Sequence, residues 1–131
     1  MSTSDNLDPR IEWDLALVGL GPSSLDLMTQ RALEIVNLVE QGKVKGFVRT
    51  RSHPASRELL EKLGGSLTCF DPLYARFDDY AALYSEMARR VVEAAVSVRD
   101  SHSSLQAVAY FVPGSPLVAE DSCLRALELA K

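Results

Sequence analysis

The sequence lacks an excess of positive charge, has few cysteines and contains no long hydrophobic run. It carries 14 Lys and Arg against 18 Asp and Glu, a formal net charge of -4. Nucleic acids and anionic membranes bind dense basic surfaces, so this balance argues against both as partners. No apolar stretch approaches the roughly 20 residues that cross a bilayer, and the first residues lack the features of a signal peptide. We therefore predict a cytoplasmic protein.

The two cysteines, Cys69 and Cys123, are far apart and belong to no Cys/His cluster. This spacing argues against a zinc site or a disulfide framework and predicts reduced thiols without a bound metal. The 131 residues, 47% of them hydrophobic, are enough for one globular domain with a core. Residues 1–12 are polar and show no periodicity, which predicts a flexible leader before a domain over 13–131.

Short apolar runs alternate with segments of helical periodicity along the domain. This alternation predicts a three-layer α/β fold, a mostly parallel sheet with helices on both faces. Gly42 and Gly64 are expected to end helices, and Tyr74, Tyr80 and Tyr84 are expected in the core. The predicted strands span 14–18, 46–50, 66–70 and 106–112, and the predicted helices begin near Leu25, Pro54, Asp78 and Ser115.

In such sheets, ligands bind beyond the carboxyl ends of the strands, where three loops contain suitable residues. The first loop, 19–24, reads Gly-Leu-Gly-Pro-Ser-Ser. Glycines let the backbone approach a ligand, although any strand-to-helix turn favours small residues. A dinucleotide-binding motif is incomplete because Ser24 replaces the third glycine and no acidic residue ends the second strand. Arg49 and Arg51 would suit a 2′-phosphate, so an NADP-linked enzyme remains an alternative.

The second loop, 49–54, contains Arg49, Arg51 and His53 at a helix start. Guanidinium and imidazole groups there are candidates for holding an anionic group of a substrate. The alternative is that the arginines are solvated and His53 caps the helix. No Ser or Cys nucleophile accompanies His53, so we predict no catalytic residue.

The third loop, 112–120, has two prolines flanking Gly114, which fixes a turn and leaves main-chain groups exposed for a ligand. The acidic pairs Asp78-Asp79 and Glu120-Asp121 precede or begin helices, where carboxylates stabilise the helix dipole. We therefore interpret them as helix caps.

Four motifs, taken together, resemble a known family. VGLGP followed by LDLMTQRALE is similar to the opening of the tetrapyrrole (corrin/porphyrin) methylases, approximately VGxGPGDxxLLTxRAxxxL. The chain most resembles the methylase-like N-terminal domain fused to MazG-type nucleotide pyrophosphohydrolases. That subgroup carries RTRxHP, FDxLY, a long amphipathic helix and YxVPGxPxVAE, matched here by 49–54, 70–74, 78–98 and 110–120. The resemblance covers Trp13 to about Ala130.

The resemblance implies two α/β domains with S-adenosylmethionine in the cleft between them. This chain would be the N-terminal subdomain, a fragment of a longer protein whose second half is absent. The activity implied is methyl transfer to a tetrapyrrole, which depends mainly on positioning. By the same resemblance, the cofactor contacts are Pro22, Pro113, Gly114, Ser115 and Val118.

The motifs also depart from the family pattern. Ser23-Ser24 replace its Gly-Asp, and Ser115 replaces the Asp of the tetrapyrrole enzymes' GDP loop. A non-catalytic ligand-binding or regulatory module attached to a MazG-type pyrophosphohydrolase therefore remains an alternative. Half a cleft excludes water poorly, so the isolated chain is expected to bind cofactor weakly and to be inactive. Its exposed apolar surface could drive formation of a homodimer.

Overall fold

The computed structural model describes residues 8–9, 11–20, 29–101 and 104–112. Its four strands form one sheet in the order β1-β4-β2-β3, and every neighbouring pair is parallel. The predicted α/β class is therefore confirmed. The strands are β1 (Leu15–Gly19), β2 (Val44–Val48), β3 (Leu67–Cys69) and β4 (Ala107–Val112).

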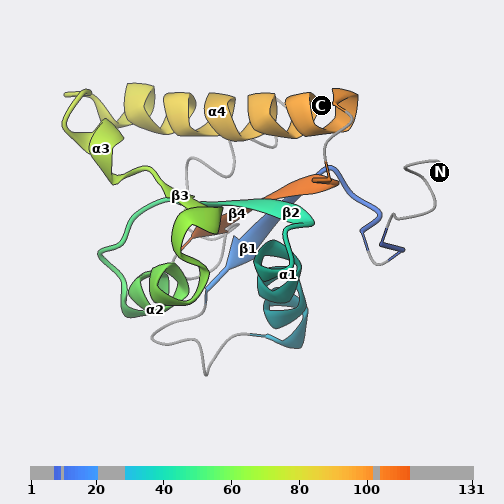
Figure 1. Ribbon diagram of the computed structural model, residues 1–131. Helices are drawn as coiled ribbons and strands as arrows, with labels where there is room; N and C mark the ends of the chain where they lie inside the picture. The colour runs from blue at the N-terminus through green and yellow to red at the C-terminus, as the bar shows by residue number, and fades with distance from the viewer. Residues whose placement is uncertain (1–7, 10, 21–28, 102–103, 113–131) are drawn as a thin grey trace.

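Helices cover both faces of the sheet, which gives the three predicted layers (Figure 1). Helices α1 and α2 pack on one face, and α4 lies along the other. Within the described ranges, none of the helices combines the length and apolar character needed to cross a membrane. The helices are α1 (Gln30–Glu40), α2 (Pro54–Leu63), the 3-10 turn η3 (Gly64–Ser66), α3 (Asp71–Tyr74) and α4 (Tyr80–Asp100).

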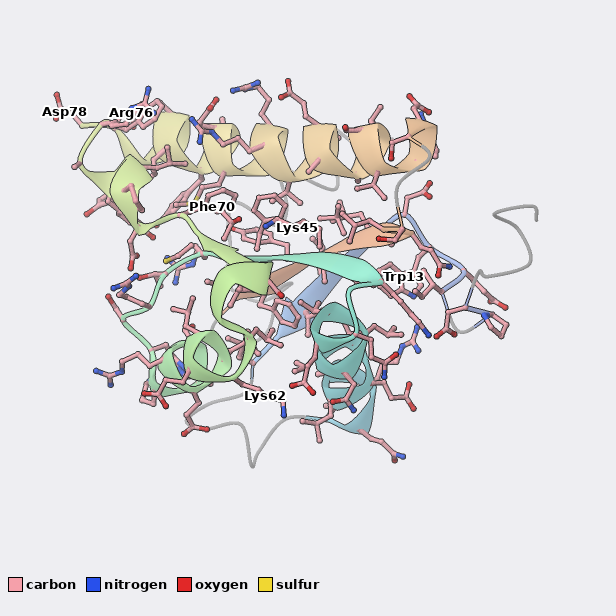
Figure 2. The ribbon with its side chains drawn as sticks, viewed as in Figure 1. Trp13, Lys45, Lys62, Phe70, Arg76 and Asp78 are labelled. Carbon is pink, nitrogen blue, oxygen red and sulfur yellow. The ribbon has the colours of Figure 1, made fainter. Side chains whose placement is uncertain are left out.

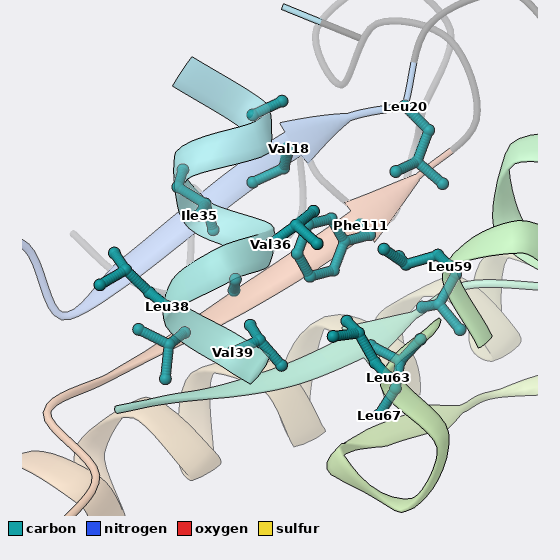
Figure 3. Close-up of a cluster of buried hydrophobic side chains, with 14 of the residues drawn as sticks. Val18, Leu20, Ile35, Val36, Leu38, Val39, Leu59, Leu63, Leu67 and Phe111 are labelled. Carbon is teal, nitrogen blue, oxygen red and sulfur yellow. The ribbon is translucent and has the colours of Figure 1, made fainter. Parts of the chain in front are cut away.

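The core is divided into two clusters by the sheet. Strand β4 is completely buried, and its alternate side chains enter opposite clusters, as the pleat of a strand requires. Phe111 lies in the first cluster with the apolar faces of α1 and α2, including Val36 and Leu59 (Figure 3). A central strand buried on both faces explains why Ala107–Val112 carries no alternation of apolar and polar residues.

The second cluster lies under α4. Phe70 stacks on Phe47 with ring centroids 5.3 Å apart and meets Tyr110 edge-on at 5.8 Å. Lys45 extends from the side of the sheet that faces α4 (Figure 2). Its Nζ lies 5.5 Å from the centroid of the Phe47 ring and donates to Thr68 Oγ1 over 2.7 Å. Burial lowers the pKa of the Lys45 ammonium.

Local capping explains where the helices begin and end. The Thr29 hydroxyl accepts the Ala32 amide, so α1 begins at Gln30 and not near the predicted Leu25. Its end agrees with prediction, because Gly42 adopts a φ of 79° that favours glycine. Asp79, one residue after the predicted cap, accepts the Ala81 amide and starts α4.

One other predicted segment differs from the structure. Strand β2 begins and ends two residues before the predicted range 46–50, so Arg49 and Thr50 already belong to the following loop. At Asp8, within the range predicted as a leader, the carboxylate forms an ion pair with Lys43 at 2.9 Å and the amide donates to Gln106. The predicted final helix lies outside the described residues.

The connections between strands decide which loops can meet. The β1–α1–β2 and β2–α2–β3 connections run in one direction across the sheet, with both helices on the same face. The β3–α4–β4 connection runs back, with α4 on the opposite face. A constant crossover handedness requires this change of face. The chain consequently leaves the neighbouring strands β2 and β3 toward opposite faces.

Candidate functional site

The first and third predicted ligand loops follow neighbouring strands. Strands β1 and β4 are paired in parallel with Gly19 opposite Val112, and the Leu20 amide donates to the Val112 carbonyl over 2.9 Å. Leu20 is fully buried. The carboxyl ends of β1 and β4, from which these two loops continue, therefore lie side by side at one edge of the sheet. The predicted cofactor contacts that follow them lie outside the described residues: Pro22, Pro113, Gly114, Ser115 and Val118.

A pocket of about 470 Å³ opens between the carboxyl ends of β2 and β3. Arg49, Thr50 and Ser52 line it from the segment after β2, and Asp71 and Tyr74 line it from α3. Because the chain diverges to opposite faces after these two strands, the crevice is a topological switch point, where open α/β sheets bind ligands.

Arg49 is fixed by main-chain and side-chain contacts. Its amide donates to the Phe111 carbonyl over 3.1 Å, which extends the pairing of β2 with β4 by one residue. Its Nη1 donates to the Tyr74 hydroxyl over 2.6 Å. The half-buried guanidinium is thereby positioned at the pocket wall.

Asp71 is the acidic group of the pocket. It accepts the Arg51 amide over 3.1 Å, and the Arg51 Nε lies 3.4 Å from the same oxygen. Burial alone would raise the pKa of the Asp71 carboxyl, but hydrogen bonds from Thr50, the Arg51 amide and Cys69, with the Arg51 charge, hold it below its usual range. Asp71 is therefore ionised at neutral pH, and Arg51 partly compensates its charge. Burial raises the pKa of the neighbouring Cys69 thiol.

The loop between β2 and α2 is shaped by short-range hydrogen bonds. The Ser52 amide donates to the Thr50 hydroxyl over 3.1 Å, a turn typical of Ser and Thr side chains. His53 Nδ1 accepts the Ala55 amide over 3.2 Å and caps α2. Of the two interpretations of His53, the structure shows the capping role, and His53 does not line the pocket.

From the sequence, Arg49 is a predicted ligand-binding residue, whereas Tyr74 and Asp71 are not. Tyr74 was expected only as a core residue, yet its hydroxyl meets Arg49. Tyr80, also expected in the core, is 67% exposed. It stacks on Tyr84, which is partly buried and packs against the second cluster. The only indication in the sequence is that Asp71 and Tyr74 follow a predicted strand, at whose carboxyl end a ligand-binding residue can lie. Only the pairing of β2 with β3 shows that these two residues lie beside Arg49.

Strand order also bears on the dinucleotide alternative. In dinucleotide-binding sheets, the strand before the glycine turn lies next to the second strand, which carries the ribose-binding residue. Here β4 lies between β1 and β2. The glycine loop after β1 and the arginines after β2 therefore follow strands that are not neighbours. In an NADP-binding sheet of the dinucleotide type, the corresponding two strands are neighbours.

Comparison with known proteins gives one curated relative for the chain. It is 35% identical over 106 residues to YabN of Bacillus subtilis (strain 168), described as an uncharacterised protein. The match covers 81% of this chain but spans about a fifth (19%) of the relative's length. No family model matches the chain. The similarity therefore connects the chain to part of a longer protein whose name states no activity.

Proposed function

We propose that the chain is the S-adenosylmethionine-binding half of a tetrapyrrole methylase-like methyltransferase domain in a longer cytoplasmic protein. The observation that supports this proposal is the parallel pairing of β1 with β4, with Gly19 opposite Val112. Because of this pairing, the two loops that carry the family motifs begin next to each other at the carboxyl edge of the sheet. A ligand bound at this edge could be contacted by both.

S-adenosylmethionine supplies a methyl group activated by its sulfonium. The role proposed for the chain is binding and orientation. Pro22, Pro113, Gly114, Ser115 and Val118 would hold the cofactor, chiefly through main-chain groups and apolar contact. Positioning can provide much of the acceleration in such a transfer, and the proposal requires no catalytic base from this half of the domain.

Calorimetric titration of S-adenosylmethionine and S-adenosylhomocysteine tests this proposal. We expect measurable binding to a longer form of the protein that extends past residue 131, and weak or no binding to this chain. Gly114→Val should weaken binding at least about tenfold, because a side chain would keep the main chain from the ligand. Gly65→Ala is the matched control, since its added Cβ meets no atom within 4 Å. Failure of the longer form to bind either compound would reject the proposal.

A second candidate is a non-catalytic module that binds a ligand and regulates a MazG-type nucleotide pyrophosphohydrolase. Ser23-Ser24 and Ser115, which replace the Gly-Asp and Asp of the family pattern, favour it. Cofactor binding without methyl transfer to corrinoid or porphyrin precursors would support this candidate. Turnover of any such acceptor would exclude it.

A further inference from the structure

The pocket between β2 and β3 follows different strands from the loops proposed to bind S-adenosylmethionine. Those loops follow β1 and β4, whereas the pocket is lined by residues that follow β2 and β3. Ligand binding in this pocket can therefore be measured independently of the proposed methyl-donor site.

Hydrogen-bond donors predominate in the lining of this pocket. The guanidinium of Arg49, the phenol of Tyr74 and the hydroxyl of Ser52 can each donate to an oxygen. Guanidinium groups bind carboxylates and phosphates through paired, charge-assisted hydrogen bonds. Tyr74 holds Arg49 from the opposite side of the crevice, so less side-chain freedom remains to be lost on binding.

The local charge also favours an anion. Arg49 and Arg51 contribute two positive charges, whereas Asp71 contributes one negative charge that Arg51 partly compensates. The sum over these three residues is positive although the whole chain carries a net charge of -4. A single carboxylate at the pocket also gives selectivity, because it repels an anion that is placed wrongly.

We propose that this pocket binds the carboxylate or phosphate group of a small molecule. Arg49 provides the principal charge-assisted contact, with Tyr74 and Ser52 as additional donors. Asp71 orients Arg51 and the loop after β2 and opposes the bound anion. These roles predict that loss of the Arg49 guanidinium weakens anion binding, whereas loss of the Asp71 charge strengthens it.

Titration of the full 131-residue chain with inorganic phosphate and, separately, with citrate tests the proposal by backbone amide NMR. We expect saturable shifts at the amides of Arg51 and Ser52 at concentrations up to about 10 mM, the range of weak millimolar binding. Shifts with phosphate alone identify a phosphate site, and shifts with citrate alone identify a carboxylate site. The absence of shifts with both probes, or shifts scattered over other basic residues, would overturn the proposal.

Four variants separate recognition from folding. Arg49→Gln should weaken binding about tenfold, the effect of losing a charge-assisted hydrogen bond. Asp71→Asn keeps the shape and an acceptor for Arg51 but removes the opposing charge, so it should strengthen binding. Tyr74→Phe should weaken binding less than Arg49→Gln does. Arg57→Gln, on an exposed arginine of α2 that does not line the pocket, is the control and should bind as the natural chain does.

Asp71→Asn also answers the concern that Arg49→Gln fails to fold. A residue that acts only in folding would not increase anion affinity when its charge is removed. Unchanged or weaker binding in a folded Asp71→Asn variant would contradict the charge arrangement proposed here. Equal losses in Arg49→Gln and Arg57→Gln would show that the anion binds by general surface charge, and the pocket would be rejected.

Discussion

Gly46 illustrates how a single residue sets the spacing of the layers. It lies in the middle of β2, where an added Cβ would approach Leu67 Cδ1 to 2.7 Å and Val39 Cγ1 to 3.3 Å. These two side chains come from β3 and from α1. The absence of a side chain at Gly46 therefore allows a helix and a neighbouring strand to pack closely against β2.

Gly46→Ala is expected to destabilise the protein by about 1–2 kcal/mol. Overpacking costs about 1–3 kcal/mol, and the smaller entropy of an unfolded chain with alanine offsets part of that. Urea unfolding measures the change. Gly65→Ala, where the added Cβ has open space, should stay within about 0.5 kcal/mol. Equal effects of the two substitutions would show that packing at Gly46 is not the cause.

At the scale of the element, α4 combines a buried face with a charged outer face. Leu83, Met87 and Val91 are buried at helical spacing. On the outer face, Glu86 accepts from Arg89 over 2.6 Å and from Arg90 over 2.8 Å. These contacts lower the pKa of Glu86 to about 2. The pairs are three and four residues apart, the spacing that brings side chains together on a helix.

The lowered pKa of Glu86 predicts a stability contribution that depends on pH. The contribution is complete above the ordinary pKa of 4.5 and is lost as the pH falls toward 2, where Glu86 takes up a proton in the folded protein. Glu86→Gln should lower the free energy of unfolding at pH 7 by less than about 1 kcal/mol, because the arginines are partly exposed. The difference should shrink between pH 4.5 and 2 in denaturant titrations. Glu61→Gln is an exposed control, and a Glu86→Gln deficit that does not vary with pH would contradict the assignment.

At the scale of the molecule, β4 joins two cores that otherwise lie on opposite faces of the sheet. Its residues alternate between the cluster with α1 and α2 and the cluster with α4. Trp13 packs against the first cluster, and Met87 is fully buried in the second. Because the chain has one tryptophan, its fluorescence reports on the face opposite Met87.

Met87→Ala is expected to cost about 2–5 kcal/mol, the range for truncating a buried side chain. The shared strand predicts that the midpoints of Trp13 fluorescence and far-UV circular dichroism fall together in urea. Val96→Ala, at a position that is 41% exposed on the same helix, should change stability by no more than about 0.5 kcal/mol. A Trp13 transition that stays in place while the helical signal is lost earlier would show that the two faces unfold separately.

The layered α/β class, the four strands and the main helices could be predicted because hydrophobic spacing is a local property of the chain. Local capping was harder to predict. Thr29 and Asp79 start their helices because of the hydrogen bonds that they form, and several nearby residues could have served equally well. Asp8 lies in a polar segment without periodicity, yet it is buried against Lys43, a contact between residues distant in sequence.

By itself, the sequence determined which segments are strands and helices and which face of each is apolar, since both follow from side-chain periodicity. It also marked the segment after β2 as a candidate ligand loop through Arg49 and Arg51. Only the tertiary structure decided that β4 lies between β1 and β2, and that Asp71 and Tyr74 face Arg49 across a pocket. The physical reason is that strand order depends on contacts between distant segments, which spacing along the chain does not encode.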